Sequence, residues 1–127
     1  MHLIIDAHSR SQQKLQDYDL LYKLLDECPS VIGMTKIKPP FVFWYEAPKP
    51  EDRGLSGFVI IAESHISIHT FPERKYVTID IFSCKDFNTK DAIDYMKNKF
   101  DLKNITSKAI KRDIRHFDIS LKNEPHY

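Results

Sequence analysis

The longest stretch of strand-like sequence runs from Gly57 to Cys84, and its hydrophobic pattern predicts a β-hairpin at the centre of the fold. Two β-rich runs, 57–70 and 75–84, flank a break at 71–75 that contains Pro72, which is typical of a hairpin connection of about five residues. The polar cluster Glu63-Ser64-His65 interrupts the first run, although strands favour β-branched and aromatic residues. Such departures from local propensity tend to mark functional sites.

The predicted hairpin brings a thiol close to this polar cluster. If the connection is centred near Glu73, Cys84 falls opposite Glu63 or Ser64 on the neighbouring strand. Directly opposed residues on antiparallel strands have Cβ atoms roughly 5 Å apart. We therefore expect a Glu–Ser peptide bond and a cysteine to be cross-strand neighbours, which is a reactive combination.

Helical spacing is clear in two other places. The first helix is expected to begin at a cap provided by Asp17 or Ser11 and to end at Pro29. One of its faces is apolar and consists of Leu20, Leu21, Leu24, Leu25 and Cys28. A second helix follows the cap residues of 86–91, and its apolar face consists of Ala92, Ile93, Met96 and Phe100.

The remaining segments alternate in the manner of strands or lack periodicity. Residues 2–7 and 104–112 predict short strands, and 34–45 predicts a strand whose Pro39-Pro40 pair favours a sheet edge or a bulge. A proline-rich loop follows at 47–54. The polar tail 120–127 is expected to be loose.

The order of elements, β-α-β-β-β-α-β, predicts a single α+β domain over residues 1–127. We expect a two-layer sandwich in which two helices cover one face of a mostly antiparallel sheet. The segment 57–62 is apolar at successive positions, Phe58 to Ala62, so both faces of its strand require cover. A second copy of the chain is the expected cover, and the sequence thus favours a homodimer.

Composition narrows the class of protein. Of 127 residues, 42% are hydrophobic and the net charge is +1, which gives no electrostatic reason to bind nucleic acid or an anionic membrane. No apolar run approaches the ~18 residues of a membrane span. Residues 1–6 lack the basic region and apolar core of a signal peptide, so we expect a cytoplasmic protein. Both cysteines are then expected to be free thiols, with Cys28 in the core and Cys84 as the candidate for chemistry.

Three familiar kinds of site are weakly supported. Three glycines are too few for a phosphate-binding loop, and His65 and His69 have no third metal ligand at a useful spacing, so no metal is expected. Ser64, His69 and Asp80 lack the nucleophile elbow of a serine hydrolase. The remaining option is chemistry on the chain itself, in which a serine hydroxyl attacks the preceding carbonyl and elimination of the resulting ester leads to a pyruvoyl group.

The residues that carry this option resemble a known family. Glu63-Ser64-His65-Ile66-Ser67-Ile68-His69-Thr70-Phe71-Pro72-Glu73, followed by Asp80-Ile81-Phe82-Ser83-Cys84, is similar to the motif of prokaryotic S-adenosylmethionine decarboxylases. The resemblance implies self-cleavage between Glu63 and Ser64 into chains 1–63 and 64–127, with Ser64 becoming a pyruvoyl group in place of pyridoxal phosphate or a metal. That group would form a Schiff base with the substrate, and the product would be the aminopropyl donor for spermidine biosynthesis.

The resemblance also implies roles for other residues. Cys84 matches the cysteine that reprotonates the substrate α-carbon, Ser56 and His69 match residues that assist self-cleavage, and Glu73 matches the glutamate that binds the ribose hydroxyls. Five residues of strand separate Ser64 from His69, about 16 Å with side chains on opposite faces. We therefore expect Ser56, His69 and Glu73 to serve the Ser64 of a second copy, in active sites shared across the dimer.

Departures from the family pattern leave the substrate open. Phe71 replaces a common Trp, Lys85 replaces a common Gly, and Ala7 occupies the place of an aromatic residue that stacks on adenine. Phe43, Trp44 or Tyr45 can provide a stacking face instead, and we expect Trp44 and Tyr45 to bind the substrate. S-adenosylmethionine is the expected substrate, and arginine or ornithine is the alternative. A third alternative is an uncleaved, non-catalytic homologue that acts as a binding partner.

Overall fold

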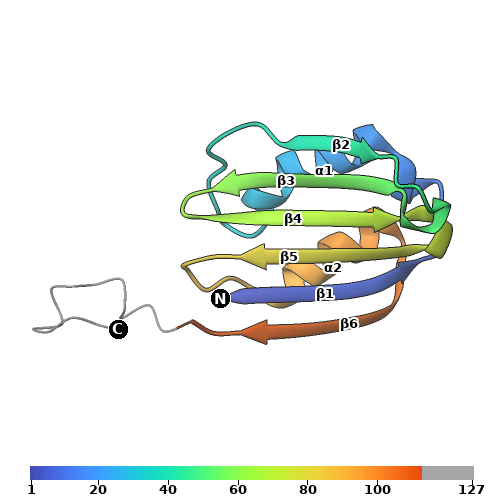
Figure 1. Cartoon of the computed structure of the whole chain (residues 1–127). Coiled ribbons are helices and arrows are strands. Elements are labelled where there is room, and N and C mark those ends of the chain that lie inside the picture. The colour runs from blue at the N-terminus through green and yellow to red at the C-terminus, as the bar shows by residue number, and fades with distance from the viewer. Residues whose placement is uncertain (113–127) are drawn as a thin grey trace, which may run out of the picture.

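Six antiparallel strands form one sheet, and two helices cover one of its faces (Figure 1). The computed structural model describes residues 1–112. The order across the sheet is β2-β3-β4-β5-β1-β6. The elements are β1 (His2–Ser9), α1 (Tyr18–Val31), β2 (Phe41–Tyr45), β3 (Gly54–Ile61), β4 (Ser64–Phe71), β5 (Tyr76–Phe82), α2 (Thr89–Phe100) and β6 (Leu102–Ile110). The predicted α+β two-layer arrangement is confirmed; the predicted loose tail, 120–127, lies outside the described residues.

The largest error of the sequence prediction concerns the first half of the central hairpin. Residues 57–70 are not one strand, because the chain reverses at 62–63 and forms two strands, β3 and β4, in which Ile61 pairs with Ser64. The turn contains none of the Gly, Asn or Asp residues that usually identify a two-residue hairpin connection. The sheet therefore has one more strand than expected.

Helix α1 begins where predicted but ends later. The side chain of Asp17 accepts a hydrogen bond from the amide of Leu20 at 3.1 Å, which is the expected cap. Pro29 does not end the helix, which continues to Val31. Proline has a helical φ and lacks only one amide donor, and the amide of Ile32 still reaches the carbonyl of Cys28 at 3.2 Å. The helix consequently tolerates proline in its last turn.

The second helix and the edge strand follow the sequence prediction more closely. Asn88 caps α2 by accepting from the amide of Asp91 at 3.0 Å, and the inward positions Ala92, Met96 and Phe100 are fully buried. The predicted strand 34–45 is shorter than expected, at Phe41–Tyr45, and lies at the sheet edge as the Pro39-Pro40 pair indicated. Its earlier part runs past the end of β3, where Lys36 forms an isolated bridge with Ile61.

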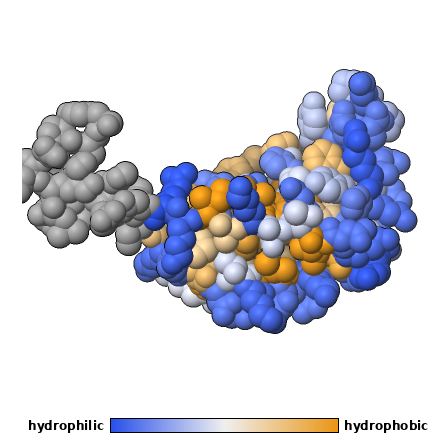
Figure 2. Space-filling view, turned by 90° about the horizontal axis from the view of Figure 1, so that it is seen from below, coloured by the Kyte–Doolittle hydropathy of each residue, from blue (hydrophilic) through white to orange (hydrophobic). Residues whose placement is uncertain are grey.

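The two faces of the sheet have different surroundings. The face toward the helices holds the core, whose buried strand residues alternate along each strand and include Leu3, Ile5, Val59, Ile61, Ile66, Ile68, Val77, Ile79 and Ile81. The opposite face, called the open face below, exposes aromatic and aliphatic side chains, with Phe41 55% and Phe58 42% exposed. Seen from the β6 side, hydrophobic residues reach the surface in a central region and hydrophilic residues surround it (Figure 2). No helix among residues 1–112 is both long and apolar enough to span a membrane.

Candidate active site

Cys84 lies against the Glu63–Ser64 peptide bond, as the sequence predicted. Strands β4 and β5 pair with His65 opposite Phe82, so that continuing the register places Cys84 opposite Glu63. The amide of Cys84 donates a hydrogen bond to Oγ of Ser64 at 3.0 Å. Its thiol donates to the carbonyl oxygen of Glu63, with Sγ and O 3.3 Å apart. One residue thus contacts both the hydroxyl and the carbonyl of this peptide link.

These contacts suit attack of the serine hydroxyl on the preceding carbonyl. A thiol donor draws electron density from the carbonyl carbon, and it faces the oxygen on which negative charge would develop. The Cys84 amide holds Oγ of Ser64 in place from the other side. Ser64 is 9% exposed, and its side chain lies on the helix-facing side of β4, where little water competes for these hydrogen bonds.

Hydrogen bonds to backbone amides hold both sides of this turn. The amide of Ala62 donates to the carbonyl of Thr35 at 2.9 Å, and the amide of Ile37 donates to the carbonyl of Ile60 at 3.0 Å. On the cysteine side, the buried hydroxyl of Ser83 accepts from the amide of Lys85 at 3.0 Å. The Glu63–Ser64 bond is therefore positioned by its neighbours on two segments distant in sequence.

Ser56 and His69 form a second reactive pair at the opposite end of β4. They face each other across β3 and β4, and Oγ of Ser56 is 2.9 Å from Nδ1 of His69. A single strand over 57–70 would have left Ser56 and His69 at its two ends, and the turn at 62–63 brings them together instead. The expectation that Ser64 and His69 face opposite sides of the sheet is confirmed, since Ser64 is buried under the helices and His69 is exposed on the open face.

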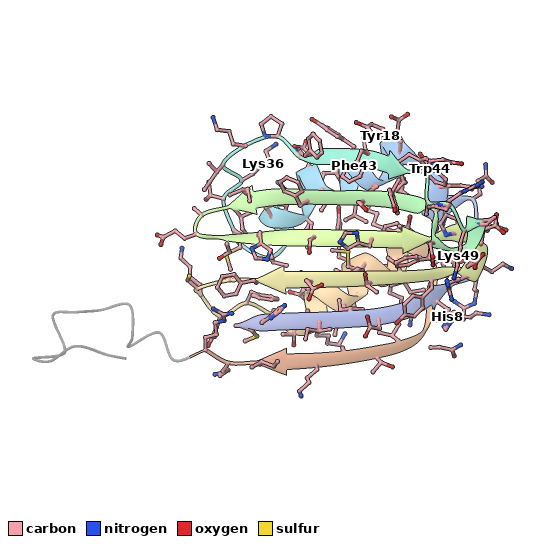
Figure 3. The ribbon with its side chains drawn as sticks, viewed as in Figure 1. His8, Tyr18, Lys36, Phe43, Trp44 and Lys49 are labelled. Carbon is pink, nitrogen blue, oxygen red and sulfur yellow. The ribbon has the colours of Figure 1, made fainter. Side chains whose placement is uncertain are left out.

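A hollow of about 490 Å³ adjoins the Ser56–His69 pair. It is bounded by residues from β2, the loop after it, β3 and the end of β4, namely Tyr45, Ala47, Pro48, Lys49, Asp52, Gly54, Ser56, His69, Thr70 and Phe71. A second hollow of about 510 Å³ shares Asp52 and Phe71 with the first and is completed by His8, Arg74, Tyr76 and Thr78. His8 and Lys49 lie at the same end of the sheet, the end away from the β3–β4 turn (Figure 3).

The structure separates Trp44 and Tyr45, the two aromatic residues that the sequence predicts to bind substrate. Tyr45 borders the first hollow. Trp44 pairs with Leu55, whose side chain is buried on the helix side, and the Trp44 indole donates to the carboxylate of Glu46 at 2.5 Å. Successive strand residues point to opposite faces, so Trp44 and Tyr45 do not share a surface in one protomer. Glu73 is exposed and lies in the short helix Pro72–Arg74, and its neighbour Arg74 borders the second hollow.

The structure also shows why Ala7 is not informative about substrate. Ala7 is 1% exposed and packs toward the helices. Its neighbour His8 lies on the open face, where the His8 and Tyr76 rings pack edge-to-face with their centroids 5.2 Å apart. Sequence reasoning missed His8, although the alternation of β1 between polar and apolar residues was the signal that places position 8 on the open face.

The two thiols differ in their surroundings, and this difference can be measured. Burial raises the pKa of the Cys28 thiol from its ordinary value of 9.0 to about 12, whereas Cys84 is partly exposed. We expect iodoacetamide at pH 8 to label Cys84 in the folded protein and to label Cys28 only after unfolding, as mass spectrometry of peptides will show.

The same pKa shift predicts a loss of stability in alkali. Above about pH 9 the unfolded chain releases the Cys28 proton while the folded chain retains it, so stability falls as pH rises from about 9 toward 12, by about 1.4 kcal/mol per pH unit. Thermal unfolding of wild type and Cys28→Ala at pH 8 and pH 10.5 checks this. An equal pH dependence in the two proteins would contradict it.

No cluster of three or more His, Cys, Asp or Glu side chains suited to a metal ion occurs within residues 1–112. The reactive residues that the structure does bring together are Ser64 with Cys84 at one end of β4 and Ser56 with His69 at the other.

Comparison with known proteins agrees with this reading of the residues. The family model for S-adenosylmethionine decarboxylase matches residues 1–113. An S-adenosylmethionine decarboxylase proenzyme of Clostridium kluyveri is 35% identical over 114 residues, which cover 89% of this chain and 86% of that one. Another, of Thermococcus kodakarensis, is 33% identical over 118 residues, which cover 92% of this chain and 78% of that one.

A solved structure supports the same assignment. The adenosylmethionine decarboxylase of Aquifex aeolicus superposes with a TM-score of 0.66 at 26% identity, over 88% of this chain and 92% of that one. The family match spans all of the residues that build the sheet, both helices and both reactive pairs. The chain therefore belongs to the S-adenosylmethionine decarboxylase family.

Proposed function

We propose that this protein decarboxylates S-adenosylmethionine after cutting itself between Glu63 and Ser64. The observation that carries the proposal is the position of Cys84, which contacts both the Ser64 hydroxyl and the Glu63 carbonyl. The related proteins named above are proenzymes, a term that fits a chain requiring such a step. Arginine and ornithine are tested below as competing substrates.

Maturation begins at the Ser64 hydroxyl. Oγ attacks the Glu63 carbonyl carbon, the C–N bond breaks, and an ester replaces the peptide link while the amine of residue 64 takes up a proton. Negative charge on the carbonyl oxygen in this step is stabilised by the Cys84 thiol, 3.3 Å away. A base then removes the α-proton of residue 64, and the Cβ–O bond breaks to leave Glu63 with a free carboxylate. Water converts the resulting dehydroalanine to a ketone and releases ammonia.

The base for the second step comes from the Ser56–His69 pair of another protomer. In one protomer the two reactive pairs lie at opposite ends of β4, about 16 Å apart along the strand. Two copies related by a two-fold axis and packed through their open faces bring the β3–β4 turn of each against the Ser56–His69 end of the other. A homodimer then has two shared sites.

The open face provides the surface for that dimer. Its apolar part is contributed by β2 and β3 and contains Phe41, Phe43, Phe58 and Ile60, each between 41% and 55% exposed. A hydrophobic sheet face of this kind is covered by a second layer in stable proteins. A second copy supplies the layer and completes the active sites at the same time.

In the mature enzyme the pyruvoyl group supplies an electron sink for the departing carboxylate. The chain supplies the rest. Cys84 is placed to deliver a proton to the substrate α-carbon, because it already lies beside residue 64. Tyr45 lines the first hollow and His8 the second, and these hollows would receive the ribose and the base; Glu73, next to the lining residue Arg74, would bind the ribose hydroxyls. The product would be the aminopropyl donor used to make spermidine.

The proposal is tested on the purified protein as expressed. Intact mass should show two chains of roughly half of 15.0 kDa each, the larger of which gains the mass of reduction by borohydride at its α-keto terminus. Release of ¹⁴CO₂ should occur from carboxyl-labelled S-adenosylmethionine and be at least about 100-fold slower from arginine or ornithine. An intact chain without an α-keto group would overturn the proposal, and faster release from an amino acid would change the substrate but keep the chemistry.

A further inference from the structure

Thr70 carries a buried hydroxyl that joins three segments of the fold. It is 2% exposed and lies on the helix side of β4. Its Oγ1 accepts a hydrogen bond from the amide of Leu55 on β3 at 2.9 Å and donates one to the carbonyl of Leu15 at 2.6 Å. Leu15 is fully buried in the short helix Lys14–Gln16, so the hydroxyl ties β3, β4 and this helix together.

These bonds lie immediately beside the Ser56–His69 pair. Leu55 precedes Ser56 and Thr70 follows His69, and the regular pairing of β3 with β4 ends at Ser56 opposite His69. Beyond that point the Leu55 amide bonds to a side chain rather than to a strand carbonyl. The Thr70 hydroxyl is therefore what fixes the separation of the two strands at the place where Ser56 and His69 meet.

Gly54 shows how closely the strands approach at this point. A Cβ atom at position 54 would lie 1.8 Å from the carbonyl oxygen of Thr70, a distance that no side chain can adopt. The two backbones are thus in contact on one side of Thr70 while its hydroxyl bonds on the other. A change that releases either contact alters the strand spacing.

We propose that Thr70 is a positioning residue, whose hydroxyl acts through Leu55 and the backbone to hold Oγ of Ser56 at 2.9 Å from Nδ1 of His69. Its consequence for self-cleavage rests on the proposed function of that pair, but its effect on the pair itself does not. A misplacement of about 1 Å in a catalytic group commonly costs about 100-fold in rate. The hydroxyl of Thr70 therefore controls maturation from the face of the sheet opposite to the reactive pair.

The test compares Thr70→Val, which has the same shape without the hydroxyl, with Thr70→Ser, which retains it. Ser9→Ala is the matched control, because it removes a fully buried hydroxyl that donates to the carbonyl of Phe100 at 2.5 Å, two strands away from β4. We measure the rate of self-cleavage in each variant, the thermal midpoint, and the ¹⁵N shifts of the His69 ring in a Ser64→Ala background that keeps the chain intact.

We expect Thr70→Val to move the His69 ring signals and to slow cleavage about 10- to 100-fold, with Thr70→Ser close to wild type. Ser9→Ala should lower the midpoint as much as Thr70→Val does and leave both the ring signals and the cleavage rate unchanged. Unmoved His69 signals in Thr70→Val, or an equal loss of cleavage in Ser9→Ala, would overturn the positioning role.

Two further outcomes are informative. Shifted His69 signals with a normal cleavage rate support the positioning role and count instead against the proposed part of the Ser56–His69 pair in maturation. If Thr70→Val does not fold, Thr70→Ala is compared with Thr70→Ser by the same measurements; ring signals that coincide in those two variants would overturn the proposal, and signals that differ would support it.

Discussion

A chain carrying Ser64→Ala stays in one piece of 15.0 kDa and releases no measurable carbon dioxide from S-adenosylmethionine. The substitution removes the hydroxyl that attacks the Glu63 carbonyl and is then eliminated with the Glu63 carboxylate, so neither the chain break nor the ketone can form. We therefore expect a loss of at least about 10⁶-fold, the lower end of enzymatic rate accelerations. Ser67→Ala, the same change three residues along β4, is the matched control and should cleave normally. Intact mass and ¹⁴CO₂ release are the measurements.

The same variant tests whether the active sites are shared. Ser64→Ala retains its Ser56–His69 pair, and His69→Ala retains its Ser64. In a mixed dimer one site contains Ser64 from the second chain and His69 from the first, and the other site contains neither. We therefore expect cleavage of about half of the His69→Ala chains after random pairing at equal amounts, and no cleavage of the Ser64→Ala chains.

The control for this mixture is a chain carrying both substitutions. When it is mixed with His69→Ala, no site contains His69, and cleavage should remain at the level of His69→Ala alone. Chains are distinguished by C-terminal extensions of different mass. If the His69→Ala chain stays uncut in both mixtures, the pair acts on the Ser64 of its own protomer, and the dimer proposed above is wrong in its arrangement.

The sequence predicted the cysteine contact well because that contact depends on short-range features. The break at 71–75 fixes the register of β4 against β5, and counting outward from it places Cys84 opposite Glu63. Residues joined by one tight connection have few alternative pairings, since a slip of one residue would turn the apolar side chains of β5 away from the core. The helix caps Asp17 and Asn88 were equally local signals.

The second reactive pair could not be predicted, because it depends on a turn without a turn signal. Ala62-Glu63 lies between Val59-Ile60-Ile61 and Ile66-Ser67-Ile68, and strand propensity is continuous across it apart from the polar cluster. That cluster was correctly taken as a departure from strand preference but was attributed to function alone. It also marks the reversal that brings Ser56 opposite His69. Because this turn was not predicted, the pairing of Ser56 with His69 could not be predicted either.

Face assignments were available from the sequence and were only partly used. Alternation along β2 places Tyr45 and Trp44 on opposite faces, and alternation along β1 places His8 rather than Ala7 on the open face. Both follow from the period of two, but only once the sheet has a known inner side. That side is set by which face the helices cover, a long-range property that the apolar pattern of 57–62 leaves ambiguous because both of its faces are hydrophobic.

Cys84→Ala should separate the two roles proposed for this residue, hydrogen bonding to the Glu63 carbonyl during maturation and proton delivery during turnover. The amide of residue 84 still donates to Ser64 Oγ after the substitution, but the thiol donor to the Glu63 carbonyl is lost. A weak donor to a developing oxyanion accounts for about 10-fold, so cleavage should slow and still reach completion. Loss of the proton donor should lower turnover of the cleaved enzyme by about 10²- to 10⁴-fold.

Cys84→Ser distinguishes hydrogen bonding from proton delivery. Its hydroxyl can donate to the same carbonyl, so maturation should be faster than in Cys84→Ala, but an alcohol gives up a proton far less readily than a thiol, so turnover should stay low. Cys28→Ala removes the other, buried thiol and should leave both rates unchanged. Rates of cleavage and of ¹⁴CO₂ release are measured separately for each variant. Wild-type turnover in cleaved Cys84→Ala would mean that another group protonates the α-carbon. Equal cleavage rates in Cys84→Ala and wild type would mean that the thiol contact to Glu63 has no part in maturation.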